Sequence, residues 1–116
     1  MASDHKTRIM YIERKAGELV GEARIGRVTY SKTGRSLYYR GKTFAVGEGL
    51  KSNFIDCESG EDYWISGPHR DGRDRLYESN LPIEIDDDAR EEYWIEIRNK
   101  PEWKNRTTTS GGKRRE

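Results

Sequence analysis

Short apolar runs, rich in β-forming residues, alternate along the chain with turns that contain glycine. The pattern predicts strands over residues 9–12, 24–30, 36–40, 43–46, 52–57 and 62–66. Most connections are too short for a crossover, so consecutive strands must pair antiparallel as a meander. Two further short strands are expected at 75–77 and 83–85, and Pro82 keeps the second of these from being a central strand.

The turns and the side-chain alternation of this meander can be assigned to particular residues. Gly34 and Gly41 follow two of the predicted strands and supply the positive φ that hairpin turns require. Because side chains alternate along a strand, one of Tyr38 and Tyr39 must point inward and the other outward.

The apolar residues of 24–30 change phase, because Ile25 is odd-numbered whereas Val28 and Tyr30 are even-numbered. Glycine inside a strand is a usual marker of a β-bulge. We therefore expect a bulge at residues 26–27 that brings the three apolar residues to one face.

One helix is predicted near the C-terminus, beginning after the three aspartates 86–88 and ending at Asn99 and Pro101. Aspartates favour a helix start because they cap unpaired N–H groups and offset the helix dipole. The apolar face of this helix consists of Ala89, Tyr93, Trp94 and Ile97. Its glutamates fall mainly on the other face.

The chain organises into one domain with two tails. Residues 8–98 form the domain, residues 1–7 are a flexible N-terminus, and residues 99–116 are a basic tail predicted to be disordered. A bent meander hides its edges by curling on itself or packing under the helix. The predicted fold class is mainly β: a small antiparallel SH3-like barrel or roll of five to seven short strands with one C-terminal α-helix.

Composition agrees with a small folded domain. The 116 residues are 32% hydrophobic and 37% charged, yet they include three Trp, seven Tyr and two Phe, too many for a low-complexity chain. No stretch approaches the ~20 apolar residues of a membrane span, and the start lacks the apolar run of a signal peptide. A single cysteine excludes an intrachain disulfide and a cysteine-based zinc cluster. We expect a cytoplasmic protein that does not engage membranes.

The net charge of +1 hides an uneven distribution. Residues 24–51 hold seven basic residues and one acidic residue. Residues 84–98 hold two basic and seven acidic residues, a net charge of −5, and residues 99–116 hold six basic and two acidic ones, a net charge of +4. A basic stretch, an acidic stretch and a basic tail therefore follow one another, and they either satisfy one another or leave a charged surface.

Catalytic and cofactor motifs are absent from the sequence, so we expect neither an enzyme nor a cofactor. His69 with Asp71 or Asp74 has the composition of an acid–base pair, but a solvated loop with local Arg–Asp pairs explains it better. The three aspartates 86–88 are explained by capping rather than by a metal. Cys57, among apolar neighbours, is expected to be a buried small hydrophobe.

The best candidate surface is the basic, aromatic pair of hairpins over 24–51, where cations interleave with flat rings. Its candidate residues are Arg24, Arg27, Lys32, Arg35, Tyr38, Arg40 and Lys42. Two functions stay open: a non-enzymatic module that engages a protein partner through an aromatic surface, or nucleic-acid binding through phosphate contact and base stacking. If the helix lies beside the hairpins, its carboxylates neutralise the cations.

Five runs together resemble a family of small uncharacterised bacterial proteins. They are residues 24–28, 37–42, 63–68, 74–77 and 91–94. The resemblance spans about residues 8–98 and implies a bacterial cytoplasmic origin. Some members carry the label 1-deoxy-D-xylulose-5-phosphate synthase, a thiamine-diphosphate enzyme. That label places no role on these residues, because such an enzyme needs a phosphate-binding motif and a larger core than one small domain supplies.

Overall fold

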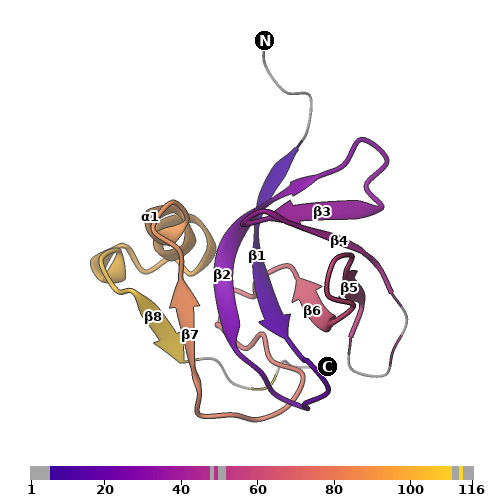
Figure 1. The fold of residues 1–116 in the computed structure, drawn as a ribbon. Coiled ribbons are helices and arrows are strands. Elements are labelled where there is room, and N and C mark those ends of the chain that lie inside the picture. Colours follow the sequence, from indigo (N-terminus) through magenta and orange to yellow (C-terminus); the bar gives the residue numbers. More distant parts are fainter. Residues whose placement is uncertain (1–5, 48, 50–51, 111–112, 114–116) are drawn as a thin grey trace.

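Six strands form a closed antiparallel barrel, in which each strand pairs with the next and β1 pairs with both β2 and β6 (Figure 1). The computed structural model describes residues 6–47, 49, 52–110 and 113. The barrel strands are β1 (Thr7–Arg14), β2 (Ala23–Tyr30), β3 (Ser36–Tyr39), β4 (Lys42–Val46), β5 (Phe54–Asp56) and β6 (Asp62–Ser66).

A second unit lies against the β2 side of the barrel (Figure 1). Strand β7 (Pro82–Ile85) pairs parallel with β2, and β8 (Thr108–Ser110) pairs antiparallel with β7. Between them run a short α-helix, a π-helical turn and a 3₁₀ turn: α1 (Arg90–Glu92), η1 (Tyr93–Ile97) and η2 (Pro101–Trp103). The prediction of a mainly β small antiparallel barrel of five to seven strands with one C-terminal helix is confirmed: the barrel has six strands, and β7 and β8 extend its sheet.

Two hydrophobic cores lie on opposite sides of the wall formed by β1 and β2. The barrel interior is filled by Met10, Ile12, Val28, Leu37, Tyr39, Phe44, Tyr63 and Ile65. The second core lies between that wall, β7 and the helical segment, and consists of Ile9, Tyr11, Ala23, Ile25, Ile83, Ile85, Ala89, Tyr93 and Trp94. Alternate residues of β1 and β2 therefore serve different cores.

The predicted β-bulge at residues 26–27 is wrong. Strand β2 pairs with β1 in continuous register from Ala23 to Thr29. Its apolar residues change phase because both faces are buried: Ile25 packs into the second core and Val28 into the barrel. In a strand that is buried on both faces, apolar residues occur on both sides and do not alternate with polar ones.

The turn and alternation predictions are confirmed. Gly34 has φ of +77° and Gly41 has φ of +79°, so both hairpin turns use the left-handed backbone conformation. In β3, Tyr39 points into the barrel and is buried, whereas Tyr38 is exposed on the outside.

The helix begins after the three aspartates, as predicted, but they do not cap it. Its N-cap is Ala89, and no side chain caps it. Asp86 is turned away toward the barrel, where it binds Tyr39 and Arg24. The apolar face is confirmed, because Ala89 and Tyr93 are buried in the second core. Tertiary ion pairing therefore overrides the capping role that the local sequence favours.

The basic tail is structured over the residues that can be described, so the prediction of disorder is wrong for 101–110. The 3₁₀ turn η2 packs Trp103 against the second core, and β8 pairs with β7. This order could not be predicted from the sequence, because the segment buries only a few side chains, among them Thr109. Residues 1–5, 111–112 and 114–116, for which flexibility or disorder was also predicted, lie outside the described residues.

The two predicted edge strands near residues 75 and 83 behave differently from expectation. The first is reduced to a single bridge between Arg75 and Lys113. The second, β7, is central, since it lies between β2 and β8. Pro82 is tolerated because it is the first residue of the strand, before the pairing with β2 begins at Glu84.

Candidate functional site

A pocket of about 480 Å³ opens at one end of the barrel. This is the end at which β1 and β3 finish and β2, β4, β6 and β7 begin. Its apolar lining consists of Ile12, Ala23, Tyr39, Phe44 and Tyr63. Four of these belong to the barrel core, and the Phe44 and Tyr63 rings pack edge to face with centroids 4.6 Å apart. The pocket thus reaches the aromatic core directly.

The outer wall of the pocket is formed by Leu81 and Pro82, just before and at the start of β7. Leu81 is one of the large apolar side chains that the fold leaves outside, with half of its surface exposed. An apolar side chain that stands free beside an aromatic pocket offers a second contact to any ligand that enters it.

Four basic side chains surround the opening, and each is paired with a carboxylate. The pairs are Arg14–Glu61 at 2.5 Å, Arg24–Asp86 at 2.7 Å, Arg40–Asp86 at 3.5 Å and Lys42–Asp56 at 3.3 Å. The Asp56 side chain is fully buried and that of Asp86 is 14% exposed, whereas Arg40 is 55% exposed. Each carboxylate therefore fixes its cation at the rim, while 38–55% of each cationic side chain stays exposed to a ligand.

The paired charges at the rim persist at neutral pH. The Glu58 backbone N–H and the Lys42 ammonium lower the pKa of Asp56, and the bond to Asp56 raises the pKa of Lys42. Two acidic residues, Glu22 and Glu84, also line the pocket, on the side of β2 and β7. The opening therefore has only basic charges where β3 ends and β4 begins, and basic and acidic charges together along β1, β2 and β7.

Asp86 is the residue that ties the rim to the second unit. It accepts hydrogen bonds from the Tyr39 hydroxyl and from Arg24 Nε at 2.8 Å. Burial, and then the Asp86 carboxylate, raise the pKa of Tyr39 to about 12, so the hydroxyl keeps its proton. Gly26 makes the arrangement possible, because a Cβ at this position would lie 2.5 Å from both Asp86 Oδ2 and the Tyr39 ring.

The seven residues predicted as one surface are divided by the structure into separate environments. Four are cations held by carboxylates: Arg24, Arg27, Arg40 and Lys42. Lys32 and Arg35 lie exposed at the β2–β3 turn, and neither has an ion pair with a described residue. Tyr38 is 40% exposed on the outside of β3.

The acidic segment lies beside the hairpins rather than on the far side of the barrel. Arg27 Nη2 is 2.7 Å from Glu92 of α1, and Asp86 binds both Arg24 and Arg40. Much of the basic excess over residues 24–51 is therefore neutralised locally. Sequence reasoning found three of the rim cations but missed Arg14 and the Leu81–Pro82 wall, which carry no local signal.

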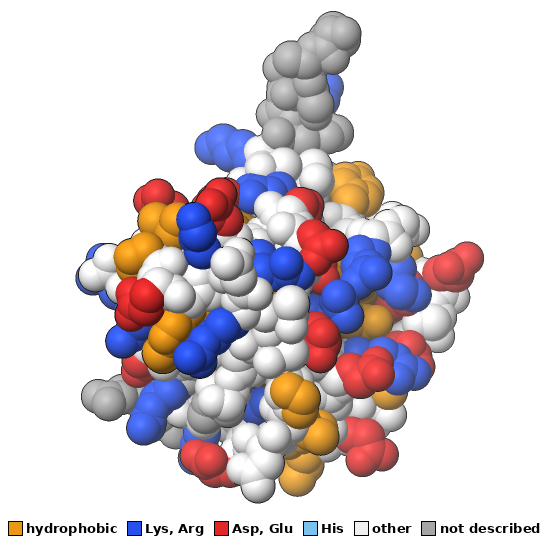
Figure 2. All heavy atoms as spheres, turned by 90° about the vertical axis from the view of Figure 1, so that its left-hand side faces the viewer, with side chains coloured by type: hydrophobic (Ala, Val, Ile, Leu, Met, Phe, Trp, Pro, Cys, Tyr) orange, Lys and Arg blue, Asp and Glu red, His pale blue; other side chains and the backbone are white. Residues whose placement is uncertain are grey.

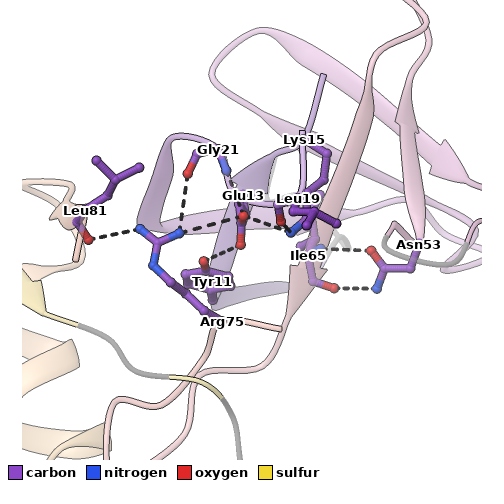
Figure 3. Close-up of polar contacts among 9 residues, drawn as sticks. All are labelled: Tyr11, Glu13, Lys15, Leu19, Gly21, Asn53, Ile65, Arg75 and Leu81. Carbon is purple, nitrogen blue, oxygen red and sulfur yellow. Dashed lines mark hydrogen bonds and ion pairs between the residues drawn. The ribbon is translucent and has the colours of Figure 1, made fainter. Parts of the chain in front are cut away.

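A buried cluster of charges, which contacts the Leu81 backbone, was also missed (Figure 3). Glu13, Lys15 and Arg75 all have fully buried side chains. Glu13 accepts hydrogen bonds from Tyr11 at 2.6 Å, from Lys15 at 2.9 Å and from the Gly21 N–H at 2.9 Å. Burial raises the pKa of Tyr11 well above its usual range, so Tyr11 remains the donor.

Arg75 connects this cluster to the loop before β7. Its guanidinium donates to the Leu81 carbonyl at 3.1 Å and to the Gly21 carbonyl at 3.4 Å, and it lies 3.7 Å from Glu13 (Figure 3). The cluster thereby fixes the position of Leu81 at the pocket. Nothing in the local sequence distinguishes these charges from exposed ones, because they are buried only by segments that pack on the outer face of β1.

Two smaller expectations are also corrected. The loop around His69 is not fully solvated, since Asp74 is buried and accepts the His69 backbone N–H at 2.7 Å. The His69 ring lies 3.6 Å from Asp74 but binds the Arg73 carbonyl at 2.6 Å, so the pair serves the loop fold. Cys57 is exposed, because β5 ends at Asp56 and the chain turns there.

Comparison with protein-family models, with curated proteins and with solved structures finds no match for this chain. The family resemblance and the SH3-like type of the barrel stay predictions. No helix among the described residues has the length and apolar character needed to cross a membrane. Within the same residues, no group of three or more His, Cys, Asp or Glu side chains is placed to hold a metal ion.

Proposed function

We propose that this protein is a non-enzymatic binding module that holds an extended segment of a protein partner at the end of its barrel. The observation that carries the proposal is the pocket itself, an opening into the aromatic core surrounded by cations that carboxylates hold in place. By the family resemblance, such a module would act in a bacterial cytoplasm.

The dimensions and chemistry of the pocket define the segment that it would accept. A volume of about 480 Å³ lies within the range of roughly 300–1,000 Å³ that is usual for ligand pockets. The rings of Phe44 and Tyr63 favour an aromatic or branched apolar side chain. Arg40 and Lys42 favour an aspartate or glutamate next to it, because their outer N–H groups can donate to a carboxylate.

A protein partner is better supported than nucleic acid bound through the hairpins over 24–51. A phosphate backbone would have to compete with the carboxylates that already hold Arg24, Arg27, Arg40 and Lys42. Binding to nucleic acid gains from releasing counterions, and a cation that is neutralised by its own protein releases few. A peptide with one carboxylate beside an apolar side chain has to compete for fewer of these cations, because the apolar contact supplies part of the binding free energy.

The experiment is a selection from a random peptide library on the full chain, followed by titration of the enriched peptide. We expect enrichment of sequences with an aromatic or branched apolar residue next to Asp or Glu. Fluorescence anisotropy should then show at least tenfold weaker binding to Arg40→Glu, and also weaker binding to Leu81→Ala. Both side chains are exposed, so the variants should fold.

Arg35→Glu is the matched control, because Arg35 is an exposed arginine of the same region that does not line the pocket. Its affinity for the enriched peptide should equal that of the wild type. The proposal is wrong if no sequence is enriched, or if the enriched peptide binds Arg40→Glu and Leu81→Ala as tightly as the wild type.

A further inference from the structure

A second cluster of cations and aromatic rings lies in the C-terminal segment, away from the barrel-end pocket. The Arg106 guanidinium lies over the Trp103 ring at 4.2 Å from the centroid, and Lys100 Nζ lies 5.0 Å from it. The Trp103 ring in turn packs edge to face on buried Trp94 at 5.3 Å. The core therefore fixes one indole ring that carries two cations at the surface.

The backbone around this ring is also fixed. Trp94 Nε1 donates to the Arg106 carbonyl at 3.1 Å, and the Arg106 N–H donates to the Trp103 carbonyl at 2.8 Å. Strand β8 begins two residues later and pairs with β7. Arg106 is thus held between a buried tryptophan and a strand, although its side chain is exposed.

The cations of this segment differ from those of the hairpins in their pairing. Lys100, Lys104 and Arg106 form no ion pair within the described part of the chain, and the segment 99–110 contains a single acidic residue, Glu102. Figure 2 looks onto the side of the molecule that carries α1 and β8, and basic side chains there lie beside hydrophobic ones, with acidic side chains among them. These three cations are therefore available to an anionic ligand.

The geometry favours single strands over duplexes. Duplex grooves are read by helices or two-stranded ribbons, whereas unstacked bases pack on aromatic rings and on flat guanidinium groups. The segment from Lys100 to Arg106 offers only a 3₁₀ turn, but it presents Arg106 stacked on Trp103. Such a stack is a platform for a base, and the lysines beside it suit phosphates.

We propose that residues 100–106 form a binding site for single-stranded nucleic acid. Arg106 on Trp103 receives a base, and Lys100 and Lys104 contact neighbouring phosphates. The site is independent of the peptide pocket, since no residue of 100–106 lines that pocket.

The test is fluorescence anisotropy of the full chain with labelled oligothymidylate and oligouridylate of about 12 nucleotides, a length within known site sizes. With about three phosphate contacts, the logarithm of the affinity should fall with a slope of about −2 against the logarithm of salt concentration. Binding should therefore weaken about fifteenfold between about 50 and 200 mM salt. The same sequence as a duplex should bind more weakly.

Lys104→Glu and Arg106→Glu should each weaken binding to the single strand by at least tenfold and flatten the salt dependence. Both side chains are exposed, and far-ultraviolet circular dichroism would verify the fold. The matched control is Lys32→Glu with Arg35→Glu, which reverses two exposed cations at the β2–β3 turn and should leave the affinity unchanged.

The proposal would be overturned by no binding to the single strand at the lower salt concentration, by an equal loss in the β2–β3 control, or by equal affinity for the duplex. Equal binding of poly-glutamate would also overturn it, because the site would then recognise acidic protein segments through charge alone.

Discussion

Replacing Glu13 by glutamine should be among the most damaging conservative changes in this protein. Glutamine has nearly the same shape and can still accept from Lys15 and the Gly21 N–H through its carbonyl, while its amide donates to the Tyr11 hydroxyl oxygen. What the substitution removes is the negative charge. Lys15 and Arg75 then remain as two cations with fully buried side chains, and neither has another ion-pair partner among the described residues.

The magnitude follows from the cost of a buried charge that loses its partner. Removing one member of a buried ion pair typically costs about 3–5 kcal/mol, and small domains have only about 5–15 kcal/mol of stability in total. For a domain of this size, that loss corresponds to a fall in melting temperature of about 12–20 °C. The excess of cations over carboxylates in the cluster favours the upper half of this range.

Thermal and urea unfolding of the two proteins would measure the difference. Glu18→Gln is the control, because Glu18 is an exposed glutamate of the adjacent loop, and its substitution should change stability by no more than about 0.5 kcal/mol. Lys15→Met in the Glu13→Gln background should restore part of the loss, since it removes one of the uncompensated cations. A melting temperature of Glu13→Gln within a few degrees of the wild type would refute the reasoning.

Two further predictions concern Asp74, in the loop between β6 and β7, and the tail strand β8. Burial raises the pKa of the Asp74 carboxyl group to about 6, above the unfolded value of 3.8. The folded state therefore favours the protonated carboxyl, and the stability that this group contributes is fully present below pH 3.8 and is lost as the pH rises through 6. The free energy of unfolding is lower by about 3 kcal/mol at pH 7 as a result. Melting curves should show that difference in pH dependence between the wild type and Asp74→Asn, and parallel curves would contradict it. Deleting residues 99–116 removes β8 and uncovers Trp94, so it should cost about 3–5 kcal/mol by urea unfolding; unchanged stability would show that β8 does not hold the second core together.

Local sequence determined the succession of barrel strands and turns. Gly34 and Gly41 indicate hairpin turns, because few other residues adopt positive φ. The alternation that buries Tyr39 and exposes Tyr38 follows from strand geometry alone. The apolar face of the helix, with Ala89 and Tyr93, was predicted for the same reason, since its spacing is a property of the helix. All these features depend on neighbours within a few residues.

The candidate pocket could be predicted only in part. Three of its four rim cations lie in the basic stretch that the sequence singled out, because charge is visible residue by residue. The carboxylate that holds two of them comes from elsewhere in the chain: Asp86 lies 62 residues after Arg24 and 46 residues after Arg40. Pairings across such separations have no local signal.

Only the tertiary structure decided which faces and charges are buried. The second unit covers the outside of β1 and β2, so β2 is buried on both faces. This burial, and not a bulge, explains why Ile25 and Val28 lie in different phases of the strand alternation. The same closure removes Glu13 and Arg75 from water and draws the tail strand β8 into the sheet. Chain composition sets which side chains are apolar or charged. Burial depends on what packs against them, and here the covering segments follow β1 and β2 by tens of residues.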